Sequence, residues 1–276
     1  MLGKMIKHEI KATGRLFLPM YLGSIVLTIA FSFLLRLTEN VGKGSLLTTA
    51  VMGISWFGYV VMLIALCAAT VIVIVFRFYK TVATSEAYLT FSLPVKTNQI
   101  LNSKLLVALV WQLLSAGMVV LSAWIMFTIR GSDTLHRMLA ELLELKPVFL
   151  AEYGSVTLGF LHLGIIVLTT VAGSTLMFFL AICLGQLCND HRVIASIGMY
   201  MVVYMVGQAV ASAVFFPLLM SGTQPMVVGQ VSTVNLDVQS IPTMSFFITL
   251  TVMQIVLMVA YYIGCALIMK KRTNVR

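Results

Sequence analysis

Charged residues are scarce in this 276-residue chain, since only 10% are Asp, Glu, Lys or Arg, whereas 60% are apolar. Soluble domains carry about 25% charged residues and about 45–50% apolar residues. A chain of this composition has more apolar surface than a soluble interior can hide from water. The scarcity of charge therefore excludes an ordinary soluble domain and predicts that lipid forms part of the solvent.

Motifs for catalysis and metal binding are also lacking. No GxxxxGK(S/T) phosphate loop occurs, because the closest run, residues 42–45, lacks the first glycine. There is no HExxH motif, no recognisable nucleophile elbow and no cysteine pair with metal-binding spacing. We therefore expect that the chain is not an enzyme and binds no cofactor or metal by itself. The cysteines, expected to be small apolar packing residues, are Cys67, Cys183, Cys188 and Cys265.

Six apolar stretches are long enough to cross a bilayer, which takes a helix of about 20 residues for about 30 Å of hydrocarbon. No stretch contains Asp, Glu, Lys or Arg. The stretches are residues 16–35, 49–76, 105–129, 156–187, 193–220 and 245–269. The sequence thus predicts an all-α integral membrane protein with six transmembrane helices in a single transmembrane domain, residues 1–276.

Basic residues are distributed unevenly among the predicted loops. With the N-terminus in the cytoplasm, thirteen Lys and Arg residues fall on the cytoplasmic side and five on the outer side. Cytoplasmic loops are enriched in basic residues, so we expect both termini in the cytoplasm. We attribute the net charge of +9 to this topology. We expect no nucleic-acid partner, because the basic residues form no patch with interleaved aromatic residues.

Residues 1–15 have a basic face and an apolar face on a helical wheel. The basic residues of one face are Lys4, Lys7, Lys11 and Arg15. The apolar residues of the opposite face are Leu2, Met5, Ile6 and Ile10. We expect an interfacial helix on the inner leaflet, with its cations near anionic lipid head groups. The alternative is an ordinary basic flank of the first span.

Residues 77–104, between the second and third spans, form a cytoplasmic segment far longer than a tight turn needs. It contains large apolar side chains that a solvated loop does not need, namely Tyr79, Tyr88, Leu89, Phe91 and Leu93. Pro94 should end any helix before it, and Thr97 is suited to cap a helix that continues into the third span. We expect a short helix that docks into a groove of a partner. The alternative is a loop folded onto its own helix ends.

Two longer segments are expected on the outer side. Residues 130–155 have a leucine-rich face and a charged face, which predicts an amphipathic helix on the outer leaflet or over the bundle. Residues 221–244 are rich in valine and glycine. Their pattern leaves open a re-entrant element, a lid or a loop.

Few polar groups interrupt the spans. His162 is the only histidine or charged residue well inside one, and we expect it to be hydrogen-bonded within the packing. We expect Gln112, Gln208 and Gln254 to form interhelical hydrogen bonds. Small residues that recur four positions apart in the fifth span permit close helix packing or a dimer contact. They are Gly207 with Ala211, and Ala209 with Ala213.

Residues 77–106 resemble the cytoplasmic segment after the second span in membrane subunits of ABC transporters of the type-2 export class. The run SEAYLTFSLPVKTNQILNSKLL follows the family's order of an acidic residue, an aromatic-Leu-Thr stretch, a Leu-Pro-Val stretch and an Ile-Leu-x-x-Lys run. These elements are Glu86, Tyr88–Thr90, Leu93–Val95 and Ile100–Lys104. A weaker resemblance, six spans with an N-terminal interfacial helix, covers the whole chain.

The resemblance implies a permease subunit that forms half of a membrane dimer, with an identical or a different second permease subunit. A coupling helix at residues 84–93 would dock on a separate soluble ATPase subunit, which binds ATP and Mg. Residues 1–15 would be an elbow helix on the inner leaflet of the bacterial cytoplasmic membrane. The residues that would couple to the ATPase are Arg77, Lys80, Glu86, Tyr88, Leu89, Phe91, Leu93 and Pro94.

The implied function is ATP-driven export of an amphipathic or lipid-like substrate, with antimicrobial peptides among the candidates. An alternative of another class is a membrane scaffold or sensor subunit that transports nothing, which the scarcity of polar groups in the spans favours. An ion-coupled secondary transporter is disfavoured, because the spans carry no carboxylate.

Overall fold

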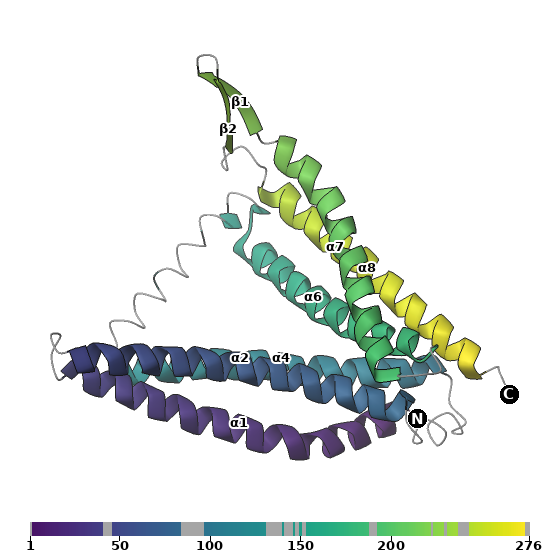
Figure 1. The fold of residues 1–276 in the computed structure, drawn as a ribbon, viewed down its shortest axis with the longest axis horizontal. Helices are drawn as coiled ribbons and strands as arrows, with labels where there is room; N and C mark the ends of the chain where they lie inside the picture. Colours follow the sequence, from purple (N-terminus) through teal and green to yellow (C-terminus); the bar gives the residue numbers. More distant parts are fainter. Residues whose placement is uncertain are drawn as a thin grey trace. The chain divides into compact units, whose positions relative to one another are not determined.

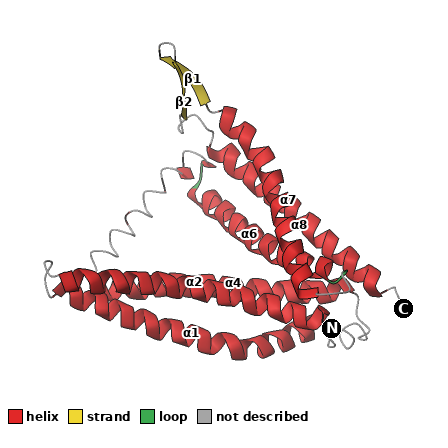
Figure 2. Ribbon diagram, viewed as in Figure 1, coloured by secondary structure: helices red, strands yellow, loops and turns green. Residues whose placement is uncertain are grey.

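The computed structural model describes most of the chain as helix (Figures 1 and 2). The described residues are 2–40, 46–83, 97–130, 140, 146, 149–150, 153–187, 192–221, 223–228, 231–236 and 243–273. Among them are six long helices, α1 (Leu2–Asn40), α2 (Leu46–Ala83), α4 (Thr97–Arg130), α6 (Val156–Gly185), α7 (Arg192–Ser221) and α8 (Thr243–Thr273). Each is long and apolar enough to cross a membrane. The six predicted helices are therefore confirmed, and they indicate a multi-pass membrane protein.

The helix α1 joins two segments that the sequence analysis separated. Its 39 residues run without a break across the expected boundary between residues 15 and 16. Residues 2–15 are therefore the first turns of the same helix that contains the first predicted span. Residues 2–15 do not form a separate helix in the structure.

The chain divides into two compact units, residues 1–146 with α1, α2 and α4, and residues 147–276 with α6, α7 and α8. In the first unit α1 packs against both α2 and α4, and α2 also contacts α4. In the second unit α6 packs against both α7 and α8, whereas α7 and α8 share only a small contact. Each unit is thus built from three long helices.

Small hydroxyl-bearing residues form the buried face of α1. Ser24, Thr28 and Ser32 recur every four residues and are all buried. Each hydroxyl donates to a carbonyl oxygen three or four residues earlier, at 2.6–2.8 Å. These side chains allow close helix contact, and their polar groups need no water. Phe17 and Leu35, both fully buried, extend this face in the two directions along the helix.

Glycines allow close approach of the helices in the second unit. A Cβ on Gly185 of α6 would lie 2.5 Å from the backbone N and Cα of Ser196 in α7. A Cβ on Gly207 of α7 would lie 2.8 Å from the hydroxyl of Tyr261 in α8. Both distances are well below the roughly 3.5–4.0 Å of favourable contact. Glycine is therefore needed where α6 meets α7, and it makes room for the tyrosine hydroxyl where α7 meets α8.

A β-hairpin follows α7 in the segment whose conformation the sequence left open. Strand β1 (Thr223–Val228) pairs antiparallel with β2 (Val231–Leu236), from Thr223 opposite Leu236 to Val228 opposite Val231. Valine favours strands, and both strands of a two-stranded sheet are edge strands, where Pro225 is tolerated. The predicted all-helical architecture is confirmed for the six long helices, and the described part of the chain contains this hairpin in addition.

Two predicted segments lie largely outside the described residues. The helix α2 ends at Ala83 and α4 begins at Thr97, so residues 84–96, the centre of the predicted coupling segment, are not among them. From Thr97, α4 continues through Lys104 into the third span, as predicted. Most of residues 130–155, the predicted outer helix, also lies outside the described part, and its conformation stays a prediction.

Candidate functional site

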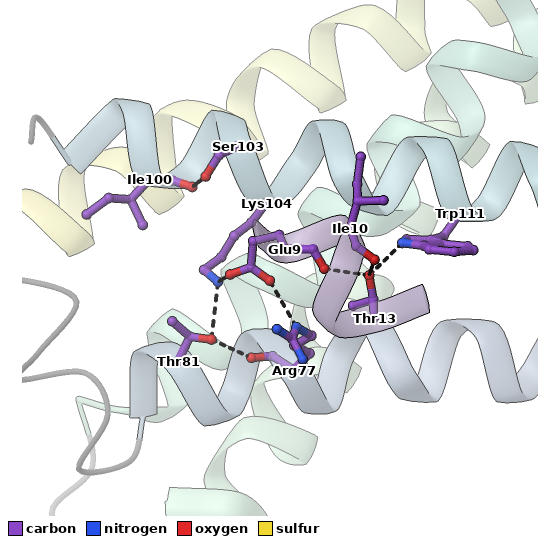
Figure 3. Close-up of polar contacts among 9 residues, drawn as sticks. All are labelled: Glu9, Ile10, Thr13, Arg77, Thr81, Ile100, Ser103, Lys104 and Trp111. Carbon is purple, nitrogen blue, oxygen red and sulfur yellow. Dashed lines mark hydrogen bonds and ion pairs between the residues drawn. The ribbon is translucent and has the colours of Figure 1, made fainter. Parts of the chain in front are cut away.

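Three charged residues from three helices meet at one end of the first unit (Figure 3). Glu9 of α1 accepts hydrogen bonds from Arg77 of α2 and Lys104 of α4. The Arg77 Nε lies 2.9 Å from Glu9 Oε2, and the Lys104 Nζ lies 2.8 Å from Glu9 Oε1. Each oxygen of one carboxylate therefore binds a different helix. We call these three residues the Glu9 cluster.

The Glu9 cluster is partly shielded from solvent. The side chains of Lys104, Glu9 and Arg77 are 7%, 22% and 32% exposed. Coulomb attraction is stronger away from water, and a shielded ion that loses its partner costs several kcal/mol. Loss of the carboxylate would therefore leave Lys104 as a buried cation without its anion.

Thr81 connects Lys104 to α2 a second time. The Lys104 Nζ donates to Thr81 Oγ1 at 3.1 Å, and Thr81 Oγ1 donates to the Arg77 carbonyl oxygen at 2.8 Å (Figure 3). The last turns of α2 and the first turns of α4 are thus joined both through Glu9 and directly.

Aromatic contacts next to the Glu9 cluster join α1 to α4. The Trp111 Nε1 donates to Thr13 Oγ1 at 2.8 Å, and Thr13 Oγ1 donates to the Glu9 carbonyl oxygen at 2.7 Å (Figure 3). Trp111 also stacks on Phe17, with ring centroids 4.3 Å apart. Residues four apart lie on one face of a helix, so Glu9, Thr13 and Phe17 face the same way. These contacts fix the rotation of α1 and hold Glu9 toward α2 and α4.

Three hydroxyls connect the same three helices further along the first unit. The Ser115 Oγ of α4 lies 2.8 Å from the Tyr21 hydroxyl of α1 and 2.7 Å from Thr70 Oγ1 of α2. Ser115 and Thr70 are buried. Together with the Glu9 cluster, this trio ties α1, α2 and α4 to one another at two levels.

The Glu9 cluster lies close in sequence to the predicted coupling segment. Arg77 is six residues before the end of α2, and Lys104 is seven residues after the start of α4. About two helical turns of 3.6 residues therefore separate each cation from residues 84–96. The two helix ends that border residues 84–96 therefore both carry a member of the Glu9 cluster.

Only two of the predicted coupling residues are among the described residues. Arg77 is bound to Glu9, and Lys80 is exposed on α2. The other six lie outside the described part: Glu86, Tyr88, Leu89, Phe91, Leu93 and Pro94. The structure adds Glu9 and Lys104, to which the sequence analysis gave no role in the site. Glu9 is the only acidic residue among the first 38, and this isolation is a signal that could have indicated an internal partner.

The predicted basic face is present at the start of α1. Lys7, Lys11 and Arg15 are exposed. Lys4 belongs to the same helix, and its side chain lies outside the described part of the chain. The exposed cations and the bundle-facing Glu9 thus occupy different faces of one helix.

Polar side chains of the second unit form hydrogen bonds within the spans. The His162 Nε2 lies 2.8 Å from Thr251 Oγ1, and its Nδ1 lies 2.8 Å from the Tyr153 hydroxyl, which confirms the expected role in packing. The Gln254 Oε1 accepts from Thr170 Oγ1 of α6 at 2.6 Å, an interhelical bond as predicted. Gln208 instead donates to Tyr204 of its own helix at 2.8 Å, and among the described residues it forms no interhelical bond, so that part of the prediction stays a prediction.

The two pairs of small residues in α7 have different surroundings. Gly207 and Ala211 line a pocket between α6, α7 and α8. Ala209 and Ala213 are exposed on the second unit. The first pair therefore serves the interior of this unit, and the second pair faces outward.

Among the described residues, no three His, Cys, Asp or Glu side chains lie close enough to hold a metal ion. The buried thiols of Cys183 and Cys265 lie 3.4 Å apart, as packed side chains of α6 and α8. Comparisons with known protein families, with curated proteins and with solved structures found no match to this chain. What the chain does is therefore inferred from its own residues, above all from the Glu9 cluster and the segment beside it.

Proposed function

We propose that this chain is the permease subunit of an ATP-driven ABC exporter of the type-2 class, and that it moves an amphipathic or lipid-like substrate outward. The resemblance at residues 77–106 and the six apolar helices support this proposal. The observation that carries it is the Glu9 cluster, because these ion pairs fasten the two helices that border residues 84–96 to each other and to α1. A segment that receives force from a partner needs such firm attachment points.

In this proposal a soluble ATPase partner, which binds ATP and Mg, supplies the energy. Closure of two such subunits displaces residues 84–96. Helix ends are weak points, because their last turns lack intrahelical hydrogen-bond partners. The Glu9 cluster joins the ends of α2 and α4 to α1, so a displacement of either end moves all three helices of the first unit together.

Residues 2–15 are assigned to the inner surface of the bacterial cytoplasmic membrane, with both termini in the cytoplasm. Lys7, Lys11 and Arg15 are exposed, and each basic residue near an anionic lipid surface contributes about 1 kcal/mol of attraction. Although residues 2–15 continue directly into the first span, this placement puts the Glu9 cluster at the cytoplasmic border of the membrane. There the ATPase can reach the coupling segment.

A second permease subunit, identical or different, completes the transporter. Ala209 and Ala213 lie four residues apart on an exposed side of α7. Small residues at this spacing permit close contact between membrane helices. Their exposure supports α7 as a contact to the second subunit.

Two substitutions in the coupling segment test the proposal. Glu86→Lys and Leu89→Asp should each lower ATP-dependent transport about tenfold or more, because a misplaced charge in a docking contact costs well over 1.4 kcal/mol. Leu46→Asp is the matched control, since Leu46 is 89% exposed at the opposite end of α2. The measurement is ATP-dependent loss of a fluorescent lysophospholipid from vesicles that contain the chain and its co-purified ATPase.

The results separate export from the alternative of a non-transporting scaffold or sensor subunit. Transport that fails in both variants and persists in Leu46→Asp supports the coupling role. Normal transport in both Glu86→Lys and Leu89→Asp would contradict the coupling role. A complex that holds an ATPase yet moves neither a lysophospholipid nor a cationic antimicrobial peptide favours the scaffold.

A further inference from the structure

A pocket of about 330 Å³ lies between α6, α7 and α8 of the second unit. This volume is roughly ten times the ≈ 30 Å³ share of one water molecule in the liquid. It also falls within the range of about 300–1,000 Å³ that small-molecule sites occupy. The pocket is open on one side, and its volume is large enough for a small molecule or part of a lipid.

The pocket lies at the middle of three predicted spans. Thr170 of α6, Gln208 of α7, and Gln254 and Tyr261 of α8 line it. Each of the four is within four residues of the midpoint of its helix. Bulk water is absent at this depth of a bilayer, and each unsatisfied polar group there costs several kcal/mol.

Several polar atoms of the lining have no partner in the described part of the chain. The Gln254 Oε1 accepts from Thr170 Oγ1, whereas its Nε2 donates to no described residue. The Gln208 Nε2 donates to the Tyr204 hydroxyl, whereas its Oε1 accepts from no described residue. The Tyr261 hydroxyl, which lies over Gly207, also has no hydrogen bond within the described residues. The pocket thus offers both donors and an acceptor to an occupant.

The lining carries hydroxyl, amide and apolar groups and no charged side chain. A charged head group would lose its hydration here without gaining a counter-ion, which is strongly unfavourable. A plain hydrocarbon chain would leave the amides unpaired. The chemistry of the pocket therefore selects an uncharged group that both donates and accepts hydrogen bonds.

We propose that this pocket binds the uncharged, hydroxyl- and ester-bearing head of a single-chain amphiphile from the bilayer, with Gln254, Gln208 and Tyr261 as its hydrogen-bonding partners. Thr170 and Gln208 are exposed on the second unit, so the pocket is open on that side and the acyl chain extends through the opening. The site does not depend on the proposed transport activity, because binding alone would satisfy the polar groups.

Photo-crosslinking of the full-length chain in lipid nanodiscs tests this proposal. The probe is a monoacylglycerol with a diazirine in its acyl chain. Two probes of equal chain length serve as comparisons: a diazirine lysophosphatidic acid, which carries a phosphate, and a diazirine alkane, which has no head group. The monoacylglycerol should label peptides of α6, α7 and α8 at least about fivefold more than either comparison, as expected for one or two net hydrogen bonds.

Two variants with matched controls locate the labelled site. Ala211→Leu fills the pocket, whereas Ala260→Leu makes the same change at an exposed position of α8 that does not line the pocket. Gln254→Leu removes the amide and leaves the Thr170 hydroxyl bonded to the Ile166 carbonyl oxygen. Gln112→Leu in α4 is its control. Labelling should fall about fivefold in Ala211→Leu and Gln254→Leu and stay unchanged in both controls.

Equal labelling by the phosphate or alkane probe overturns the proposal, as does undiminished labelling in both pocket variants. Thermal melting in detergent identifies any variant that does not fold, and the other pocket variant then decides. If neither pocket variant folds, the proposal is tested by the unsubstituted chain alone, which must be labelled more by the monoacylglycerol than by the other two probes.

Discussion

Glu9 binds two cations that lie 68 and 95 residues further along the chain. At the residue scale this carboxylate has two tasks, because it neutralises Lys104, whose side chain is 7% exposed, and it bridges α2 and α4. Its removal would leave Lys104 and Arg77 near each other with no anion between them. The ion pairs therefore belong to the interior contacts of the first unit.

Glu9→Gln should lower the free energy of unfolding of the first unit by about 2–4 kcal/mol, because partly buried cations lose their charged partner. Lys7→Gln is the control on the same helix, since Lys7 is exposed. It should change the free energy of unfolding by less than about 0.5 kcal/mol. Thermal and denaturant unfolding in detergent measure both effects, and equal stability of the two variants would contradict the structural role of Glu9.

The double variant Glu9→Gln with Lys104→Met should be more stable than Glu9→Gln alone. It no longer contains a buried cation without its anion, and Thr81 can still donate to the Arg77 carbonyl oxygen. The same unfolding measurements give the coupling energy of the pair. Strictly additive losses would show that Glu9 and Lys104 act independently.

Residue types could be read from the sequence, but their partners could not. The resemblance implies an ATPase contact for Arg77, and it gives no sign of the ion pair that Arg77 forms with Glu9 of α1. The pairing depends on the rotation of α1, which the packing of Thr13 and Phe17 on Trp111 sets. Such contacts join residues far apart in the chain, so they cannot be predicted from the pattern of neighbouring residues in the sequence.

At the scale of elements, helix existence was predictable because hydropathy and length are local properties of each stretch. The limits of the helices were not, since a helix can continue beyond the apolar residues. Accordingly, α1 begins at Leu2 and α2 extends to Ala83, past the predicted edges at residues 16 and 76. The hairpin of β1 and β2 escaped prediction because its strands are short and their pairing is not visible in either strand alone.

Gly185→Ala should separate α6 from α7. The new Cβ would lie 2.5 Å from backbone atoms of Ser196, and backbone cannot yield as a flexible side chain can. Overpacking of this kind costs about 1–3 kcal/mol. The expected result is a lower melting temperature of the purified chain in detergent.

Gly164→Ala is the matched control in the same helix. A Cβ on Gly164 would meet nothing within 4 Å, and alanine favours helix over glycine by up to about 1 kcal/mol. Its melting temperature should therefore equal or exceed that of the unsubstituted chain. A lower melting temperature for Gly164→Ala, together with an unchanged melting temperature for Gly185→Ala, would contradict the close α6–α7 contact.

At the scale of the whole molecule, large apolar side chains face outward from both units. Leu22 of α1 and Ile64 of α2 are 60% and 62% exposed, and Leu161 of α6 is 60% exposed. In water such surfaces would drive aggregation, whereas in a bilayer they contact lipid. Both units therefore present the outer surface that a membrane protein requires, and the polar contacts of each unit lie among its own helices.

The proposed coupling depends on residues 77–104 being on the cytoplasmic side, where an ATPase can reach them. The sequence supports this side through the distribution of its basic residues. The same rule places residues 36–48, between the first two spans, on the outer side. Both placements can be tested with the same chemistry at Lys43 in residues 36–48 and at Lys96 in residues 77–104.

Side-specific labelling of Lys96→Cys is the most direct test of this claim, with Lys43→Cys as its counterpart, both in a chain whose Cys67, Cys183, Cys188 and Cys265 are replaced by alanine. A membrane-impermeant maleimide should label Lys43→Cys on intact cells. It should label Lys96→Cys only after the membrane is permeabilised. Labelling of Lys96→Cys on intact cells would place the segment outside and contradict its role in coupling to an ATPase.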